Sequence, residues 1–404
     1  MRNQPNWRTP AVVLFCGALI LTLGLGIRQT FGLFLQPMSL DLGWGRSNFS
    51  FALALSNLIW GIAQPFFGAW ADKQGSARVV AVSGLLYAAG LALMPLTTTP
   101  LMLDLSVGLL VGLGISGVSF GVILGVIGRA FPPERRSLAL GIASSGGSFG
   151  QFLCLPYGQL LISSFGWKIA LVALSGTILA TVPLALAMME QRRPASSGGP
   201  QQSLATALAE AGRHAGFWYL TAGFFVCGFQ VTFISVHLPA YLMDMKLSPS
   251  VGATALALIG LFNIAGSFAA GYLGGKFSKK YLLSSIYLLR AVIIGIFLVL
   301  PVSPSSTYVF AAGMGFLWLG TVPLTNGLVG QIFGVRFVST LFGIVFLSHQ
   351  IGSFLGVWMG GYLFDATGSY TTVWVTSIAL SVIAAVLNLP IDERPLQRAA
   401  GATA

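Results

Sequence analysis

Long apolar stretches alternate with short polar ones along the whole chain. Most of the apolar stretches reach the ~20 residues that an α-helix needs to cross the hydrocarbon core of a bilayer. They run continuously, without the alternation of apolar and polar residues that is typical of barrel strands. The pattern predicts twelve spanning helices, at about 11–36, 47–70, 79–97, 101–128, 138–163, 168–189, 216–243, 250–274, 281–301, 307–330, 341–364 and 370–390.

One long polar stretch, MEQRRPASSGGPQQS at 189–203, interrupts this pattern half way along the chain. Its Gly, Ser, Pro and Gln residues are typical of a linker. We therefore expect an N-terminal six-helix bundle at 1–190, a cytoplasmic linker at 191–214, and a C-terminal six-helix bundle with a short cytoplasmic tail at 215–404. The expected fold class is an all-α integral membrane protein of two pseudo-symmetric bundles.

The composition supports a membrane protein, because 55% of the residues are hydrophobic, 8% are charged and the mean hydropathy is +0.84. The net charge of +11 does not indicate nucleic-acid binding, because the basic residues are distributed unequally between the two sides of the membrane. If the N-terminus is cytoplasmic, 16 of the 21 Lys and Arg residues lie on the cytoplasmic side, and only Arg46, Lys168 and Lys246 lie outside. This asymmetry predicts a multi-pass protein of a bacterial inner membrane with both termini in the cytoplasm.

The two halves of the chain repeat each other. Three pairs of segments match at offsets of 202 or 203 residues, namely GIRQTFGLFLQP at 26 with GFQVTFISVHLP at 228, GAWADKQGSAR at 68 with GYLGGKFSKK at 271, and GIASSGGSFG at 141 with GIVFLSHQIG at 343. Three matches in the same order indicate a parallel duplication. Many transporters are built in this way, with the substrate site near the midplane between the halves.

The corner between the second and third spans carries a motif of glycines and charges, formed by Gly68, Asp72, Lys73, Gly75 and Arg78. The glycines permit close helix approach and a tight turn, and the aspartate can cap a helix or pair with a base. The motif resembles the signature of the major facilitator superfamily, and the resemblance extends over essentially the whole chain. It implies that this corner steadies the outward-open state by docking one half on the other.

Two further segments resemble one group within that superfamily. A basic residue followed by TFGLFLQPM and then LGWGRSNFS, together with CGFQVTFISVHLPAYLMD in the seventh span, is similar to the monocarboxylate and oxalate:formate porters. Members of that group often carry a carboxylate-binding arginine in the eighth span. The corresponding segment here, LFNIAGSFAAGYLGG, has no charge, which leaves Arg28 as the candidate for that role.

Arg28 lies within an apolar run from Pro10 to Pro37. An arginine near the middle of a membrane helix costs about 2.5 to 3.5 kcal/mol on insertion scales, so it should face a cavity, a partner or the interface. All ten acidic residues fall in loops or near span ends, and the planar guanidinium suits a carboxylate brought from outside. We predict that Arg28 binds a substrate anion. The alternative is that it reaches the outer headgroups or binds Asp41 or Asp244.

Other polar side chains within the spans are further candidates. Those expected to bind substrate are Gln230, Ser144, Gln151, Asn263, Asn326 and Trp318. Gln230 is the repeat partner of Arg28 and should face it across the cavity, whereas helix packing is the alternative for the small polar residues. His237 and His349 are the candidates for proton coupling, or else neutral groups between helices, and a position close to the periplasmic surface is a further alternative for His237. Arg290 is expected to reach the interface or to make a structural contact.

These observations favour a transporter over an enzyme, because the sequence shows no nucleophile, metal cluster or acid pair near a membrane face. We expect a monomeric secondary transporter of a small organic anion, a monocarboxylate, without cofactor or metal. Its partners would be membrane lipid and either protons, in symport, or a counter-anion, in antiport, through alternating access. The alternatives are efflux of a larger amphipathic or drug-like compound, which the missing buried acid disfavours, and a transporter-like membrane sensor.

Overall fold

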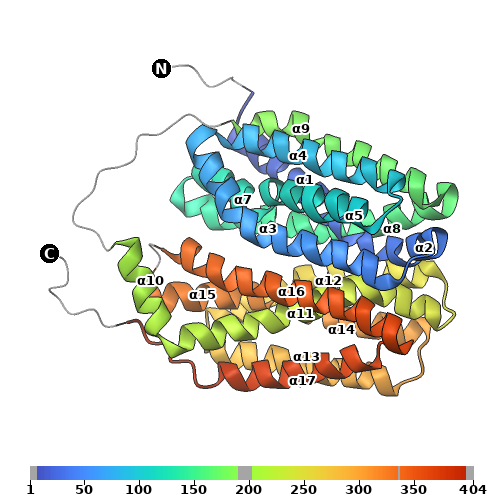
Figure 1. Cartoon of the computed structure of the whole chain (residues 1–404). Coiled ribbons are helices and arrows are strands. Elements are labelled where there is room, and N and C mark those ends of the chain that lie inside the picture. Colours follow the sequence, from blue (N-terminus) through green and yellow to red (C-terminus); the bar gives the residue numbers. More distant parts are fainter. Residues whose placement is uncertain (1–6, 190–202, 335–336, 397–404) are drawn as a thin grey trace.

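The computed structural model describes residues 7–189, 203–334 and 337–396, and helices make up most of it (Figure 1). Eleven helical segments in this part of the chain are long and apolar enough to cross a membrane. The longest, Ala139–Met188, contains Gly166 at φ 78° and ψ 166°, a conformation that glycine tolerates and that divides the segment into two helices. With this division, the twelve predicted spans are present.

Each half of the chain supplies six spans. The first three spans are α1 (Pro10–Gln29) with α2 (Phe31–Leu42), α3 (Arg46–Gln74) and α4 (Ser76–Leu93). The fourth span consists of α5 (Pro100–Leu103), η2 (Asp104–Val111), α6 (Gly112–Val118) and α7 (Phe120–Ala130). The fifth and sixth spans are the two parts of α8 (Pro133–Leu179), the second of which continues into α9 (Thr181–Leu184). The last six are α11 (Ala215–Asp244), α12 (Pro249–Gly274), α13 (Lys279–Val299), α14 (Pro304–Leu317) with α15 (Thr321–Phe333), α16 (Val338–Thr367) and α17 (Thr371–Asn388). Within the expected linker, α10 (Leu204–Arg213) forms a short helix, and residues 190–202 lie outside the described part.

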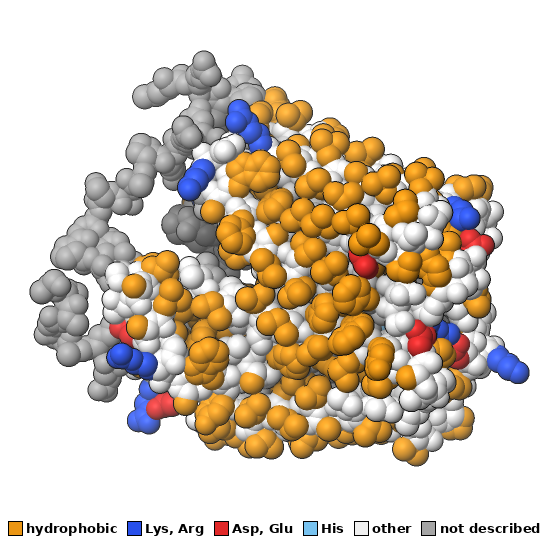
Figure 2. Space-filling view, in the orientation of Figure 1, with side chains coloured by type: hydrophobic (Ala, Val, Ile, Leu, Met, Phe, Trp, Pro, Cys, Tyr) orange, Lys and Arg blue, Asp and Glu red, His pale blue; other side chains and the backbone are white. Residues whose placement is uncertain are grey.

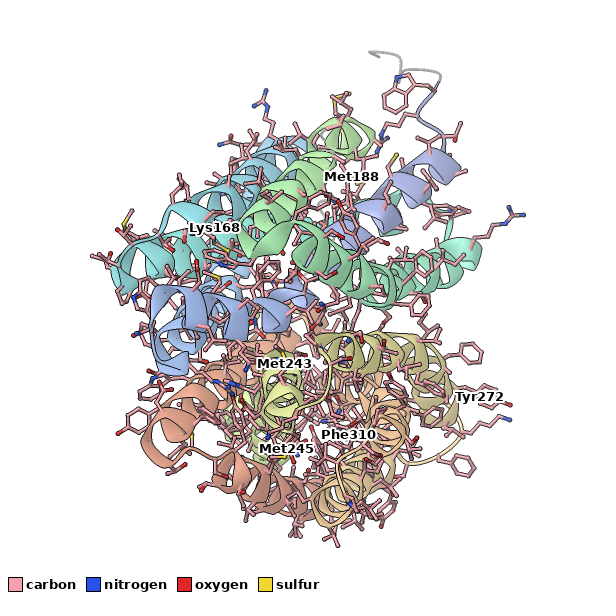
Figure 3. All side chains as sticks on the ribbon, turned by 90° about the vertical axis from the view of Figure 1, so that its right-hand side faces the viewer. Lys168, Met188, Met243, Met245, Tyr272 and Phe310 are labelled. Atoms are coloured by element: carbon pink, nitrogen blue, oxygen red, sulfur yellow. The ribbon has the colours of Figure 1, made fainter. Side chains whose placement is uncertain are left out.

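The two sets of helices form two bundles that lie side by side. An end-on view separates them, with Lys168 and Met188 in the first bundle and Met243, Tyr272 and Phe310 in the second (Figure 3). The bundles meet mainly through α3 with α16, α8 with α12, and α2 with α11. We call the end of the molecule that carries α10 the α10 end, and the opposite end, where α3 begins, the Arg46 end (Figure 1).

Two glycines let the bundles approach closely. A Cβ atom on Gly32 of α2 would overlap the carbonyl oxygen of Ser235 in α11. A Cβ atom on Gly61 of α3 would lie 2.8 Å from the side chain of Gln350 in α16. Any side chain at these two positions would therefore push the halves apart.

The outer surface of the molecule is apolar. Phe15, Phe268 and Val299 are 68%, 77% and 85% exposed, and hydrophobic side chains cover the middle of the face in Figure 2, with charged side chains gathered mainly at the two ends. An apolar belt of this extent needs lipid around it. The chain is a multi-pass membrane protein.

The fourth and tenth spans are both interrupted near their middle. In the fourth span, Ser119 adopts an extended conformation between α6 and α7. In the tenth span, α14 ends at Leu317 and α15 begins at Thr321. The two breaks lie about one repeat offset apart in the sequence, so both halves free backbone polar groups at equivalent places, and these groups need partners.

Candidate functional site

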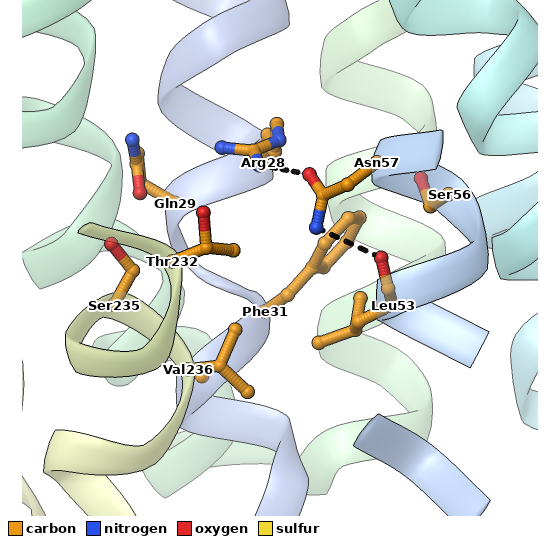
Figure 4. A pocket seen from close by; sticks show the side chains of 10 residues that line it. Arg28, Gln29, Phe31, Leu53, Ser56, Asn57, Thr232, Ser235 and Val236 are labelled. Atoms are coloured by element: carbon orange, nitrogen blue, oxygen red, sulfur yellow. Dashed lines mark hydrogen bonds between the residues drawn. The ribbon is translucent and has the colours of Figure 1, made fainter. Parts of the chain in front are cut away.

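A small pocket lies between the two halves (Figure 4). Its lining comes from the first two spans on one side and from α11 on the other, and consists of Arg28, Gln29, Phe31, Gly32, Leu53, Ser56, Asn57, Thr232, Ser235 and Val236. The lining combines one cation, several amide and hydroxyl groups, and apolar side chains. Both halves of the molecule therefore contribute to one site.

Arg28 lies near the middle of its span. It follows Pro10 by 18 residues in a span of 33 residues. At ~1.5 Å per residue, this places it about 27 Å along a helix of about 50 Å. The break between α1 and α2 follows directly, where the hydroxyl of Thr30 donates to the carbonyl of Ile27 at 2.7 Å. Arg28 therefore lies near the middle of its span rather than at either end of it.

The guanidinium of Arg28 contacts two side chains of α3. Its Nη2 donates a hydrogen bond to Oδ1 of Asn57, and its Cζ lies 5.0 Å from the centre of the Trp60 ring, within cation–π range. The amide nitrogen of Asn57 donates in turn to the carbonyl of Leu53 at 3.0 Å. A guanidinium has five N–H donors, so these contacts leave donors for a ligand.

The carboxylates proposed as alternative partners of Arg28 are paired elsewhere. Asp41 lies 3.2 Å from the amine of Lys168, and Asp244 lies 2.6 Å from Arg46. Across the part of the chain that the structure describes, Arg28 forms no ion pair with a carboxylate. The site thus holds a cation that no carboxylate of the described residues neutralises.

A second group of side chains links this site to the other half. Nε2 of Gln350 in α16 donates to the backbone carbonyl of Asn57 at 3.0 Å, and Oε1 of Gln350 lies 3.0 Å from Nδ1 of His349. The His349 ring stacks on Phe346, and Phe346 contacts Trp60 edge-on with ring centres 5.6 Å apart. His349 therefore does not line the pocket, and these neighbours connect it to Arg28.

At the Arg46 end, an ion pair joins the two halves. The guanidinium of Arg46 binds both oxygens of Asp244, at 2.6 and 2.7 Å. The backbone amides of Arg46 and Ser47 donate to the carboxylate of Asp365 at 2.9 and 2.8 Å. Since Arg46 and Ser47 belong to α3 whereas the acids end α11 and α16, these contacts close the Arg46 end.

His237 belongs to this closed end rather than to the pocket. Nε2 of His237 lies 2.9 Å from the carbonyl of Val357, which can only accept, so this nitrogen carries the proton. Nδ1 of His237 then accepts from the hydroxyl of Tyr370 at 3.0 Å, and that hydroxyl accepts from Arg46 at 2.9 Å. Burial raises the pKa of the Tyr370 phenol well above its usual range, so it keeps its proton. These bonds describe a neutral histidine.

Gln230 does not face Arg28, so this part of the sequence interpretation is wrong. Its amide nitrogen donates to the carbonyl of Ser377 at 2.8 Å and to the hydroxyl of Ser381 at 2.5 Å, both in α17. Its oxygen accepts from Arg290 at 3.4 Å. The interior of the C-terminal bundle thus satisfies both ends of the amide, which turns Gln230 away from the pocket.

Arg290 makes the structural contact that was expected as one of two alternatives, and does not reach the interface. Its side chain is fully buried and donates to the carbonyls of Leu317 (2.8 Å) and Trp318, at the break of the tenth span. The Trp318 side chain is also fully buried and does not line the pocket. Arg290 therefore supplies donors to carbonyls that the interrupted helix leaves without their usual partners.

Two of the expected binding residues instead bridge α8 and α12. Oδ1 of Asn263 accepts from the backbone amide of Leu319 at 3.0 Å, and its Nδ2 donates to Ser148 in the other half at 2.8 Å. Gln151 donates to the carbonyl of Leu256 at 2.9 Å. These contacts agree with helix packing, the alternative considered for small polar residues.

The remaining candidates lie outside the pocket. Ser144 is half-buried on α8, Asn326 is exposed on α15, and neither lines the pocket. Sequence reasoning missed Asn57 and Gln350. Both are amides within spans, and that position was the signal that could have identified them.

The motif at the corner between α3 and α4 is partly described. Gly75 has φ 101°, which confirms the predicted tight turn. A Cβ atom on Gly68 would have no heavy atom within 4 Å, so the expected close helix approach is absent in this conformation. Lys73 and Arg78 are exposed, and the side chain of Asp72 lies outside the described atoms.

Comparisons with known proteins agree with this architecture. Residues 14–356 match the family model of the Major Facilitator Superfamily. The chain is 27% identical to monocarboxylate transporter 13 of Rattus norvegicus over 377 residues, which cover 92% of this chain and 85% of that protein. It is 26% identical to YcxA of Bacillus subtilis (strain 168), an uncharacterized MFS-type transporter, with 96% of each chain covered.

One solved structure shows the same fold. The crystal structure of a bacterial homologue of the human lysosomal transporter Spinster, in an inward-facing and unoccupied conformation, superposes with a TM-score of 0.75. The alignment covers 96% of this chain and 97% of that one, at 18% sequence identity. The similarity in fold thus extends over nearly the entire length of both proteins.

Proposed function

The chain belongs to the major facilitator superfamily, and we propose that it is a secondary transporter of small organic anions, monocarboxylates in particular, that binds the anion at Arg28. Membership of this family makes it a membrane transporter of small molecules and not an enzyme. The anionic substrate is the finer part of the proposal. Its support comes from the pocket, and from relatives that are named monocarboxylate transporters.

The observation that carries the proposal is the unpaired charge of Arg28. Its guanidinium lies near the middle of the span, between side chains of both halves, and no carboxylate of the described chain neutralises it. A half-buried cation in the middle of a membrane span is costly, and a bound anion lowers that cost. A carboxylate can accept two parallel hydrogen bonds from the donors that Asn57 leaves free.

We further propose that this conformation is inward-facing, with the α10 end towards the cytoplasm. The Arg46–Asp244 pair closes one end of the contact between the halves. The predicted excess of Lys and Arg on the α10 side supports a cytoplasmic orientation. Gly68 has no close neighbour in this state, as we expect if its corner docks only in the outward-open state.

The coupling is proton symport or anion exchange, and His349 is the proton candidate nearest the pocket. It reaches the Asn57 carbonyl through Gln350, so a change in its protonation would act on the anion site. An exchanger would instead need a second anion on the opposite side. The two mechanisms differ in whether a proton gradient or an internal anion drives uptake.

The test is uptake of labelled pyruvate, lactate, benzoate and oxalate into proteoliposomes. Wild type, Arg28→Gln and Arg28→Lys are compared with and without an inward proton gradient, and with and without unlabelled acid inside. We expect Arg28→Gln to abolish uptake of the transported acid and Arg28→Lys to retain part of it, because lysine keeps the charge but not the planar fork.

The matched control is Arg394→Gln, which removes one positive charge from an exposed arginine outside the spans. It should transport as the wild type does. Full uptake by Arg28→Gln would refute the role of Arg28. Failure of well-folded wild type to take up any acid of the panel would refute the substrate class and favour an uncharged or amphipathic substrate, or a sensor.

A further inference from the structure

Asn57 and Gln350 connect the anion site to the contact between the halves. Asn57 lies in α3 of the first half and is 4% exposed, and Gln350 lies in α16 of the second half and is fully buried. The two residues meet through one hydrogen bond, from Gln350 Nε2 to the Asn57 carbonyl, at 3.0 Å. Asn57 also accepts a hydrogen bond from Arg28 through its side chain, so Asn57 connects Gln350 to Arg28.

The orientation of the Asn57 amide is fixed by its partners. The carbonyl of Leu53 can only accept, so the amide nitrogen of Asn57 must face it, at 3.0 Å. The amide oxygen of Asn57 is then the atom that faces Arg28 and accepts from Nη2 (Figure 4). Asn57 therefore holds one edge of the guanidinium and determines which donors remain for a ligand.

The Gln350 amide is oriented in the same way. Its nitrogen donates to the Asn57 carbonyl, whose second lone pair is available beside the ordinary helix bond. Its oxygen lies 3.0 Å from Nδ1 of His349. Gly61 makes room for this arrangement, because a Cβ atom there would lie 2.8 Å from both Cβ and Cγ of Gln350.

Asn57 and Gln350 thus form a buried path of hydrogen bonds that runs from α16 of the second half to Arg28 of the first half. Buried amides that lose a partner pay the full cost of desolvation, so each bond in the path favours the others. The path exists only while α3 and α16 are in contact at this depth. A rearrangement of the halves that separates α3 from α16 would break the hydrogen bond from Gln350 to the Asn57 carbonyl.

We propose that Asn57 is the positioning residue of the anion site and that Gln350, from the opposite half, holds Asn57 in place, so that anion affinity depends on the contact between the halves. This inference rests on the proposed function, since it concerns the anion bound at Arg28. Asn57 acts through the orientation of Arg28, and Gln350 acts one step further away.

The first experiment measures KM and kcat for the acid of the panel that wild type takes up fastest. We expect Asn57→Ala to raise KM about tenfold to a hundredfold, as for the loss of a hydrogen bond to a charged group. Gln350→Ala should raise KM about two- to tenfold, as for a neutral bond. A merely structural role would lower kcat or the amount of folded protein and leave KM unchanged.

Near-isosteric variants keep the test valid if the alanine variants do not fold. Asn57→Asp places a carboxylate against Arg28, which neutralises the guanidinium, so uptake should fall as far as in Arg28→Gln. Gln350→Glu replaces the donor to the Asn57 carbonyl with an acceptor and should raise KM at least as much as Gln350→Ala. Unchanged KM in both variants would overturn the proposal.

The matched control is Gln151→Ala. Gln151 also donates from its amide to a backbone carbonyl of the opposite half, that of Leu256 at 2.9 Å, but it makes no contact with Arg28 or Asn57. Its loss weakens the contact between halves by one similar bond and should leave KM within twofold of wild type. An equal rise of KM in Gln151→Ala and Gln350→Ala would overturn the special role of Gln350.

A second readout does not depend on the substrate. In protein with isotope-labelled arginine, the Nε–H signal of Arg28 is the one that disappears in Arg28→Lys. This signal should shift in Asn57→Ala and Gln350→Ala and stay in place in Gln151→Ala. An unmoved signal in Gln350→Ala overturns the inference, whereas a shifted signal together with no acid uptake by wild type refutes only the proposed function.

Discussion

Arg46, the first residue of α3, and Asp244, the last residue of α11, form a two-pronged ion pair that joins the halves of the molecule at one end. Their side chains are only 10% and 25% exposed, so solvent screens the pair less than it screens a surface pair. We expect Arg46→Gln or Asp244→Asn to weaken this contact by about 1 to 3 kcal/mol and to populate a state that is open at the Arg46 end.

Spin labels at Leu40 and Ala366, which are exposed on α2 and α16 near this end, measure the opening. The variants should add a longer component to the distance distribution of wild type. The double variant should resemble either single one, because each already breaks the same pair. A distribution identical to that of wild type would show that the ion pair does not hold the end closed.

The two histidines should respond differently to substitution. His237 is satisfied as a neutral ring by Tyr370 and Val357, whereas His349 contacts Gln350, which donates to Asn57 of the anion site. We expect His237→Gln to keep the pH profile of uptake and His349→Gln to flatten it. Uptake measured between pH 5 and 8, where histidine titrates, decides the matter. A flattened profile in His237→Gln alone would reverse the assignment.

The buried phenol of Tyr370 should make the protein sensitive to alkaline pH. Burial raises the pKa of Tyr370 in the folded state, so above about pH 10 the unfolded chain loses this proton first. The stabilisation is complete below the unfolded pKa and is lost as the pH rises towards the folded one. Apparent Tm measured from pH 8 to 11 should fall more steeply for wild type than for Tyr370→Phe, and parallel curves would contradict this.

Arg290 should matter for stability and not for anion affinity. Its Nη2 donates to both carbonyls at the break of the tenth span while its Nη1 donates to Gln230, and it does not line the pocket. Arg290→Lys keeps the charge but cannot reproduce this geometry, so we expect a loss of about 1 to 3 kcal/mol and a lower apparent Tm, with unchanged KM. A raised KM with wild-type Tm would place Arg290 in the binding machinery instead.

Gly32 should not tolerate even a methyl group. A Cβ atom there would overlap the Ser235 carbonyl of the opposite half, so Gly32→Ala should reduce uptake strongly and loosen the contact of α2 with α11. Gly271→Ala is the matched control, because no heavy atom lies within 4 Å of a Cβ atom at that position. Equal uptake by the two variants would show that the halves adjust at Gly32 without cost.

The pattern of apolar runs was enough to predict the spans and the two halves, because the length of a membrane helix is set by the bilayer rather than by its neighbours. Even Gly166, which divides the long fifth segment, falls between two predicted spans. Arg28 was identifiable as a candidate because a charged residue within a spanning helix is rare and usually marks a functional site.

The partners of the polar side chains could not be predicted in this way. The repeat placed Gln230 opposite Arg28, but the direction of a side chain depends on which neighbours satisfy its hydrogen bonds. The partners of Gln230 are Arg290 and α17, which lie within the C-terminal bundle. Arg46 was counted only as a charge outside the membrane. A comparison of the charges at that face, with Asp244 and Asp365 at the ends of other spans, was the available signal.

The hydrogen bonds that the amides of Arg46 and Ser47 donate to Asp365 have a further consequence for α3. The residue that precedes this helix, Gly45, offers no side-chain cap, so the first turn of α3 is capped by a carboxylate that belongs to the other half. An uncapped first turn frays, because its amides have no partner within the helix. The second span therefore loses its cap whenever the Arg46 end opens, and hydrogen exchange at these two amides would report the fraction of molecules that are open at any moment.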